Sequence, residues 1–328
     1  MGMCAAGSPA SGAHAAPAAL SPPDGGSFGI QLLDAPSNRR DDPRAHRYIV
    51  DHLPPGEAIQ RRVRVVNNSP DKLRMEVYPA AATVDKSGFR FLPGEATNEL
   101  TSWMSIQPAT LTLDAGQEAT PTVTIRVPPR ASAGERYAVI WASVSSKPVA
   151  DGTVRQVNRA GVRVYLDIGP GGDPPADFSI GPVTPRRGKD GSPSVHITVD
   201  NTGQRALDIS GDLSLSDGPA GARAGPFKVG NGTTVAVGGS RTIAVPLPRN
   251  LPDGHWTLKV ELRSGQVTRT ASGRVTFPKP GQSGIGAFFS GEHTTRTLIA
   301  GSVAVPLLVL AGLALIARRS RLRNSQTG

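Results

Sequence analysis

Short runs in which apolar and polar residues alternate, separated by turn residues, extend from residue 28 to residue 278. In residues 58–67, for example, Val63 and Val65 alternate with Arg62 and Arg64. Successive side chains of a β-strand point to opposite faces, so we expect the valines in a core and the arginines in solvent. The pattern predicts an all-β chain built from sandwiches. Similar runs occupy residues 28–33, 48–50, 73–77, 120–127 and 162–168.

The run at residues 136–144 differs from its neighbours because it is almost continuously apolar. It also contains two aromatic residues, Tyr137 and Trp141. A run of this kind is typical of a central strand that is covered on both faces. We therefore predict a central strand at this position, with Trp141 in the core of the sandwich.

The second half of the chain repeats the order of the first half. The segment Val65-Val66-Asn67-Asn68 matches Val199-Asp200-Asn201-Thr202, and a glycine precedes an aromatic-led run in both halves, at Gly134 and Gly254. A Gly- and Pro-rich linker at residues 170–176 separates the halves. The sequence thus predicts two tandem immunoglobulin-like β-sandwiches, at residues 28–169 and 177–278. The intervening loops differ in length, so the match suggests a duplication without showing one.

Residues 298–317 contain no charged side chain. A helix of about 20 such residues spans the roughly 30 Å hydrocarbon core of a bilayer. Four arginines follow in the tail at residues 318–328, and positive residues beside a span remain in the cytoplasm. We therefore expect a single-pass cell-membrane protein with a transmembrane helix at 298–317 and a cytoplasmic basic tail. The sandwiches would be extracellular, on a stalk at residues 279–297.

The N-terminal residues 1–27 are small and mostly uncharged, which suggests a signal peptide remnant followed by a disordered segment. Ala13-His14-Ala15 would be its cleavage site. Cys4 is the only cysteine, so a disulfide within the chain is excluded. A lipid attached to Cys4 is the alternative, and the sequence leaves open both this and the true translation start.

Composition offers little support for catalysis. No nucleophile elbow, zinc-binding HExxH helix or phosphate-cradling loop is present, so we expect no enzyme, no cofactor and no catalytic residue. His46 and His52 flank Asp51, but the arginines around His46 would repel a cation, so we expect no metal site either. The net charge of +10 suits an anionic cell envelope, and nucleic acid is not expected outside the cell.

Several segments of the first half carry a family resemblance. They resemble the peptidoglycan-binding domain of bacterial WxL-interacting surface proteins, and the layout of sandwiches, membrane helix and basic tail is similar too. The resemblance implies that the first domain binds cell-wall peptidoglycan and that the second recognises another surface protein. The segments are Leu100-Thr-Ser-Trp103, Leu111-Thr-Leu-Asp-Ala-Gly116, Val127-Pro-Pro129 and Ala133-Gly-Glu-Arg-Tyr-Ala138.

The candidate glycan-binding residues combine arginines with one aromatic residue. Arginines could bind phosphates or carboxylates of an anionic wall polymer through charge-assisted hydrogen bonds, although ordinary solvation explains them as well. Trp103 could stack on a sugar ring. A structural spacer that binds another surface protein is the alternative function. The candidate residues are Arg39, Arg40, Arg62, Arg64 and Trp103.

Overall fold

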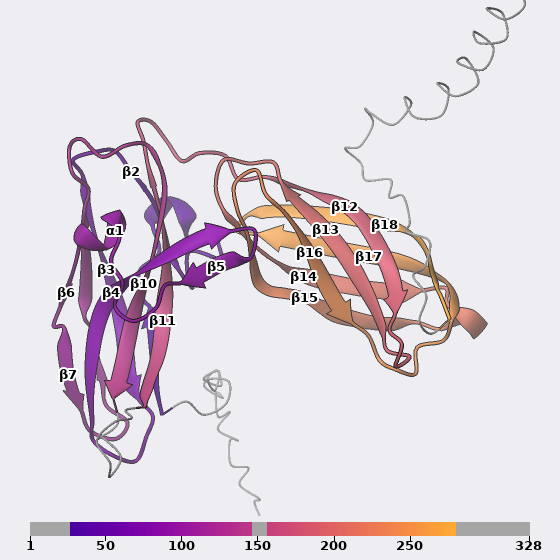
Figure 1. Cartoon of the computed structure of the whole chain (residues 1–328), viewed down its shortest axis with the longest axis horizontal. Helices are drawn as coiled ribbons and strands as arrows, with labels where there is room; N and C mark the ends of the chain where they lie inside the picture. The colour runs from indigo at the N-terminus through magenta and orange to yellow at the C-terminus, as the bar shows by residue number, and fades with distance from the viewer. Residues whose placement is uncertain (1–26, 146–155, 280–328) are drawn as a thin grey trace, which may run out of the picture. The chain divides into compact units, whose positions relative to one another are not determined.

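The computed structural model describes residues 27–145 and 156–279, which are coloured in Figure 1. Within these residues the chain is all-β, as the alternation predicts. Helix is limited there to α1 (Glu99–Ser102) and the 3-10 turns η1 (Ser37–Arg39) and η2 (Pro219–Gly221). None of these described helices is long and apolar enough to cross a membrane. The predicted span at 298–317, most of the stalk and the leader segment lie outside the described residues.

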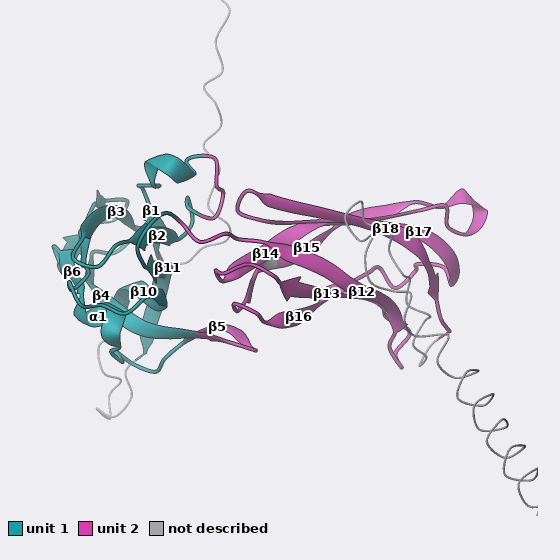
Figure 2. Ribbon diagram, turned by 90° about the horizontal axis from the view of Figure 1, so that it is seen from above, with its two compact units in different colours: residues 1–40, 45–83, 91–172 teal, residues 41–44, 84–90, 173–328 magenta. Residues whose placement is uncertain are grey.

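The chain divides into two compact units, which Figure 2 shows in different colours. The first comprises residues 1–40, 45–83 and 91–172, and the second comprises residues 41–44, 84–90 and 173–328. Each is a sandwich of two β-sheets, the immunoglobulin-like arrangement. The two short segments at 41–44 and 84–90 are therefore grouped with the second unit, although they precede residue 173 in the sequence.

The first unit pairs its two sheets around one core. Its first sheet has the strand order β1 (Phe28–Leu32), β3 (Ala58–Asn67), β9 (Thr122–Arg126) and β6 (Met104–Gln107), with β8 (Glu118–Ala119) beside β3. The other sheet has the order β2 (Ile49–Leu53), β11 (Val157–Ile168), β10 (Gly134–Ser145), β4 (Leu73–Asp85) and β5 (Gly88–Phe91), with β7 (Thr110–Leu113) beside β4. Residues 84–90, at the end of β4 and in β5, are grouped with the second unit. In this sheet β2 runs parallel to β11, whereas the pairs β11–β10, β10–β4 and β4–β7 are antiparallel.

Alternation decides which side chains fill this core. Val63 and Val65 are fully buried, whereas Arg62 and Arg64 face solvent, as the sequence predicts. The central strand β10 lies between β11 and β4, and it also agrees with the prediction. Its core-facing residues are Ala138, Ile140 and Ala142.

The second unit has a three-stranded sheet and a four-stranded sheet. The three-stranded sheet has the order β12 (Phe178–Arg187), β13 (Pro193–Asn201) and β16 (Ser240–Pro246). The four-stranded sheet has the order β15 (Ala224–Val235), β14 (Leu207–Ser216), β17 (Gly254–Ser264) and β18 (Val267–Phe277). Trp256 is central to its core, with only 2% of its surface exposed. The indole Nε1 of Trp256 donates to the carbonyl of Pro252 at 3.2 Å.

A buried asparagine fixes one end of the first sandwich. Asn67 is fully buried at the end of β3, and its Nδ2 donates to the carbonyl oxygens of Asp71, Leu113 and Asp114 at 2.7, 3.0 and 3.1 Å. Its Oδ1 accepts from the backbone N–H of Ser69 at 2.9 Å. Buried polar groups are stable only when paired, and here one side chain satisfies the turn and the end of β7.

Asn201 occupies the corresponding place in the second sandwich. Its Nδ2 donates to the carbonyl oxygens of Arg205, Val235 and Ala236 at 2.8, 3.2 and 3.0 Å. Its Oδ1 accepts from the backbone N–H of Gly203 at 3.0 Å. Both asparagines thus bond the carbonyl four residues on and the N–H two residues on. The sequence match between the two halves therefore reflects a shared structural element.

An aromatic face on the first sandwich

Strand β10 has a second face, directed away from the core. Because Ala138, Ile140 and Ala142 point inward, Tyr137, Val139 and Trp141 point to the outer side of the sheet. The neighbouring strands place further rings there. Tyr78 of β4 is opposite Trp141, and Tyr165 of β11 is opposite Tyr137.

We call this surface the aromatic face, and it combines six rings with one cation. It includes all four tyrosines of the 328-residue chain. Tyr48 immediately precedes β2, and Phe91 ends β5. Arg163 of β11 lies opposite Val139. The members of the aromatic face are Tyr48, Tyr78, Phe91, Tyr137, Trp141, Arg163 and Tyr165.

The rings contact one another in tilted and edge-on arrangements. The Tyr165 ring lies 5.8 Å from that of Tyr48 and 5.9 Å from that of Tyr137, measured between centroids. The Phe91 and Trp141 rings are 4.8 Å apart, with an angle of 59° between their planes. Such pairs are mutually favourable because the positive edge of one ring approaches the negative face of another. The contacts hold the rings in a defined arrangement.

Arg163 connects the two groups of rings. Its guanidinium carbon lies 5.3 Å from the centroid of the Tyr48 ring and 6.0 Å from that of the Phe91 ring. A cation over an aromatic face is attracted by the ring quadrupole. The aromatic face therefore carries a positive charge among its rings.

The sequence-based prediction that Trp141 belongs to the core is wrong. Its ring is half-buried on the outer side, where it lies over β11, and a Cβ added at Gly161 would come within 2.6 Å of it. An almost continuously apolar strand does not require protein on both of its faces, because the outer-facing residues can be aromatic rings that cover the sheet themselves. The Nε1 atom of Trp141 is buried and has no hydrogen-bond partner in the described part of the chain.

Exposure varies across the aromatic face. Tyr165 is fully buried beneath its neighbours, whereas 45% of the Phe91 surface is exposed. Tyr48, Tyr78 and Tyr137 are half-buried. Accessible rings with an apolar body and a polar tip can bind ligands that are flat and partly apolar while still forming hydrogen bonds.

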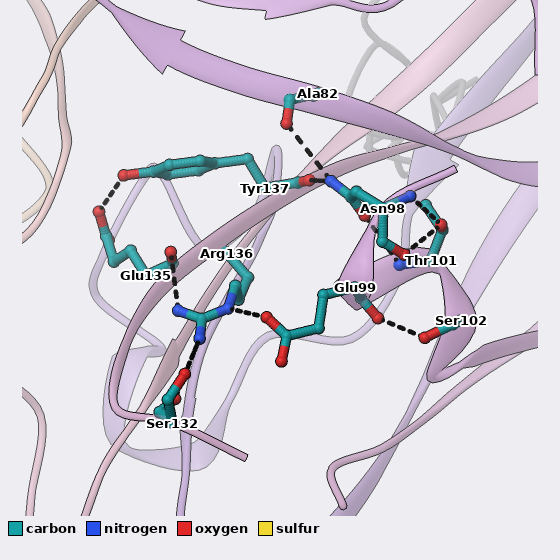
Figure 3. A network of polar contacts seen from close by, with 9 residues as sticks. All are labelled: Ala82, Asn98, Glu99, Thr101, Ser102, Ser132, Glu135, Arg136 and Tyr137. Atoms are coloured by element: carbon teal, nitrogen blue, oxygen red, sulfur yellow. Dashed lines mark hydrogen bonds and ion pairs between the residues drawn. The ribbon is translucent and has the colours of Figure 1, made fainter. Parts of the chain in front are cut away.

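Two of the segments that carry the family resemblance meet at one end of β10, as Figure 3 shows. Asn98 caps α1: its Oδ1 accepts from the N–H of Thr101 at 3.0 Å, and the Thr101 hydroxyl accepts from the N–H of Asn98 at 2.8 Å. Asn98 Nδ2 also donates to the carbonyl of Tyr137 at 2.8 Å. Leu100 is fully buried in the core. Leu100 and Thr101 therefore fix the short helix.

Arg136 connects the start of β10 to α1 and to the loop before β10. Its Nε donates to Glu99 Oε2 at 2.7 Å, and its Nη2 donates to the hydroxyl of Ser132 at 2.6 Å (Figure 3). The hydroxyl of Tyr137 donates to Glu135 Oε2 at 2.7 Å. These contacts hold the start of β10, the strand from which Tyr137 and Trp141 project.

Trp103 lies outside the aromatic face. It follows α1 and directly precedes β6 of the other sheet, where its half-buried side chain packs against the core. Its backbone N–H donates to the carbonyl of Leu100 at 3.0 Å.

The predicted arginines occupy other elements. Arg62 binds Asp34 with two nitrogens, Nε to Oδ2 at 3.1 Å and Nη2 to Oδ1 at 2.7 Å. The side-chain hydrogen bond from Arg62 holds the pKa of Asp34 below its usual value. Arg64 donates from Nη2 to Gln31 Oε1 at 2.8 Å. Arg39 ends η1 and Arg40 follows it. Arg62 and Arg64 lie on β3, and β9 separates β3 from β6, the strand that Trp103 precedes, so the structure does not bring the predicted residues together in one sheet position.

The residues around Asp51 bind protein groups. The Asp51 carboxylate accepts from Arg61 Nη2 at 2.5 Å, and His52 Nδ1 contacts Asp167 Oδ2 at 2.6 Å. His46 Nε2 contacts the carbonyl of Arg40 at 2.6 Å. Among residues 27–145 and 156–279, no group of three His, Cys, Asp or Glu side chains is arranged to hold a metal ion.

Comparison with known proteins gives no family. No protein-family model matches the chain, and neither does any curated protein. Similar solved structures include the YadV chaperone, with 10% identity, a TM-score of 0.41, and coverage of 76% of this chain and 99% of that one. A chain of the Salmonella enterica SafA pilin–SafB chaperone complex has 12% identity, a TM-score of 0.39, and coverage of 75% and 97%. The class 5 fimbriae chaperone CfaA has 13% identity, a TM-score of 0.34, and coverage of 74% and 98%. The likeness concerns the β-sandwich fold and nothing finer.

Proposed function

We propose that the first sandwich is a non-enzymatic module that binds cell-wall glycan across its aromatic face. In this proposal the chain is a bacterial surface protein, anchored by residues 298–317 and displayed outside the cell. One observation carries the proposal: every tyrosine of the chain, with Trp141 and Phe91, lies on the outer side of a single sheet. A β-sandwich can fold with a polar outer face, so the rings call for another explanation.

Sugar polymers suit such a surface. The C–H groups on one side of a pyranose ring form an apolar patch that packs on the negative face of an aromatic ring. The hydroxyls at the edge of the sugar need hydrogen-bond partners, and the hydroxyls of the half-buried Tyr48 and Tyr78 provide them. A row of rings across β4, β10 and β11 would contact several consecutive sugars.

Arg136, in one segment of the family resemblance, and two residues just before another segment support the aromatic face. Glu99, Arg136 and Asn98 hold the start of β10, and thereby the position of Tyr137. Arg62 and Arg64 already bind carboxylate or amide groups of the protein, so we assign them, with Arg39 and Arg40, at most a secondary contact with an anionic wall polymer. Trp103 is assigned to packing.

Sedimentation with purified insoluble peptidoglycan tests the proposal. The full-length chain should sediment with the polymer. Phe91→Ala should weaken binding by about tenfold or more, because an aromatic side chain at the centre of an interface is worth about 2 kcal/mol. Val237→Ala is the matched control, since Val237 is an exposed apolar residue of the second sandwich, 47% exposed. No retention of the wild-type chain, or equal retention of Phe91→Ala, would overturn the proposal.

The alternative function is a spacer that holds another surface protein through the second sandwich. Crosslinking on intact cells distinguishes the two. A dominant protein crosslink to the second sandwich, combined with no retention on peptidoglycan, would favour the spacer.

A further inference from the structure

The indole N–H of Trp141 is a hydrogen-bond donor without an acceptor in the described part of the chain. Its Nε1 atom is buried, so water does not replace the missing partner. Tryptophan Nε1 can only donate, and a buried donor left unpaired loses its hydration without compensation. In the second sandwich Trp256 meets this requirement through the carbonyl of Pro252 at 3.2 Å. The contrast singles out Trp141 as a donor that a bound ligand could satisfy.

The surroundings of Trp141 limit the chemistry of that ligand. Phe91 lies 4.8 Å from it and Tyr78 is directly opposite on β4. A carboxylate placed between these rings would lose much of its hydration, and the guanidinium of Arg163 is already held over the Tyr48 ring at 5.3 Å. A hydroxyl could also accept from the indole, but it brings no apolar group to pack on the rings. A neutral carbonyl attached to a small apolar group fits best.

We infer that Trp141 donates to the acetamido carbonyl of an N-acetylated sugar, so that the aromatic face selects N-acetylhexosamine chains over unsubstituted glucans. This inference rests on the proposed glycan-binding function. The acetamido group combines a carbonyl acceptor with a methyl group that packs on an aromatic ring. Phe91 is the most exposed ring beside Trp141, so an incoming sugar would stack on it while the ring shifts to admit the acetamido group to the indole N–H.

Two tetrasaccharides with the same β-1,4 linkage test the inference by titration calorimetry on the full-length chain. One consists of N-acetylglucosamine and the other of glucose, which carries a hydroxyl where the first carries the acetamido group. The wild-type chain should prefer the acetylated sugar by about two- to tenfold, the range that one neutral hydrogen bond provides. Trp141→Phe should reduce this preference to about onefold. Trp103→Phe makes the same change at a tryptophan outside the aromatic face, and it should leave the preference intact.

A measurement on the wild-type chain covers the case in which Trp141→Phe does not fold. With 15N-labelled tryptophan, one of the three indole N–H signals should move downfield on addition of the acetylated sugar and stay in place with the glucose sugar. Trp103→Phe removes the signal of Trp103, which must not be the one that moves. No such shift would overturn the inference.

The outcomes separate the inference from the proposed function. Equal affinity for both sugars would overturn the acetamido selectivity while leaving glycan binding intact. No affinity for either sugar would also overturn it, and sedimentation with peptidoglycan would then decide whether the proposed function fails too. Binding of a protein partner that depends on Trp141, without sugar binding, would contradict both.

Discussion

The two sandwiches are built alike inside and differ outside. Gly134 and Gly254 begin the long strands β10 and β17, and both have a φ of +118°, a conformation that favours glycine. Beyond this point the outer faces diverge. β17 presents Thr257, Lys259 and Glu261 to solvent, whereas the matching side of β10 carries aromatic residues. The two interiors share the elements that the fold requires. The aromatic face is present on one sandwich only, so we attribute it to binding and not to folding.

The largest effect that tests this shared interior is loss of the buried asparagine. Asn67→Ala and Asn201→Ala should each reduce the free energy of unfolding by about 3 kcal/mol or more, because several buried backbone groups lose their partners. Hydrogen exchange measured separately over each sandwich reports the loss. If one of the two variants loses less than about 1 kcal/mol of unfolding free energy while the other loses the expected amount, the two asparagines are not structurally equivalent.

A pair of glycine substitutions separates packing from function. A Cβ at Gly161 would meet the Trp141 ring at 2.6 Å, and one at Gly218 would meet the Trp256 ring at 2.4 Å. Gly161→Ala and Gly218→Ala should each cost about 1–3 kcal/mol through overpacking. Only Gly161→Ala should also weaken retention on peptidoglycan. Equal weakening by Gly218→Ala would mean that general destabilisation, and not the aromatic face, governs binding.

The salt bridge on the other sheet should matter less. Arg62→Gln removes the guanidinium contacts with Asp34 and keeps the backbone N–H that donates to Asp34 Oδ2 at 2.7 Å, and the ion pair is exposed and screened by solvent. We expect almost unchanged stability at neutral pH and full retention on peptidoglycan. Loss of retention comparable with that of Phe91→Ala would restore the arginines as the principal glycan site.

A smaller pH effect should distinguish the second sandwich. Burial, followed by repulsion from Arg186, lowers the pKa of His196 below its ordinary value near 6.5. The unfolded chain therefore binds this proton more readily, so the stabilising contribution is complete above that value and is lost as the pH falls below it. His196→Gln should flatten this dependence. Hydrogen exchange of β13 between pH 8 and pH 5 measures it, and an unchanged slope in the variant would contradict the assignment.

The sequence predicts the strands better than it predicts the surface. Val63 and Val65 alternate with polar neighbours, so their burial follows from local pattern alone. The match of Asn67 with Asn201 is visible in the sequence, but the bonds of Asn67 to Leu113 and Asp114 depend on which strands become neighbours. The prediction of Trp141 in the core is wrong for a related reason. Its position opposite Tyr78 is a matter of strand register, which no local pattern encodes.

The candidate site could be predicted even less. The resemblance indicates Trp103 and the charge pattern indicates the arginines, whereas the rings gather elsewhere. The sequence signal for the aromatic face is the apolar character of residues 136–144. That signal fits a strand buried on both faces, and it fits equally a strand whose outer face carries aromatic rings. Counting tyrosines would have identified the residue type, but only the sheet order brings Tyr48, Tyr78, Tyr137 and Tyr165 onto one side.

Hydrogen exchange with soluble peptidoglycan fragments tests the central claim most directly, because it reports both sandwiches in one experiment. The account predicts slower exchange in β4, β10 and β11 when the fragments are added to the full-length chain. It predicts no change in β17 and β18, whose outer face is polar. Protection confined to the second sandwich or to β3, or no protection at all, would contradict the claim that the aromatic face binds glycan.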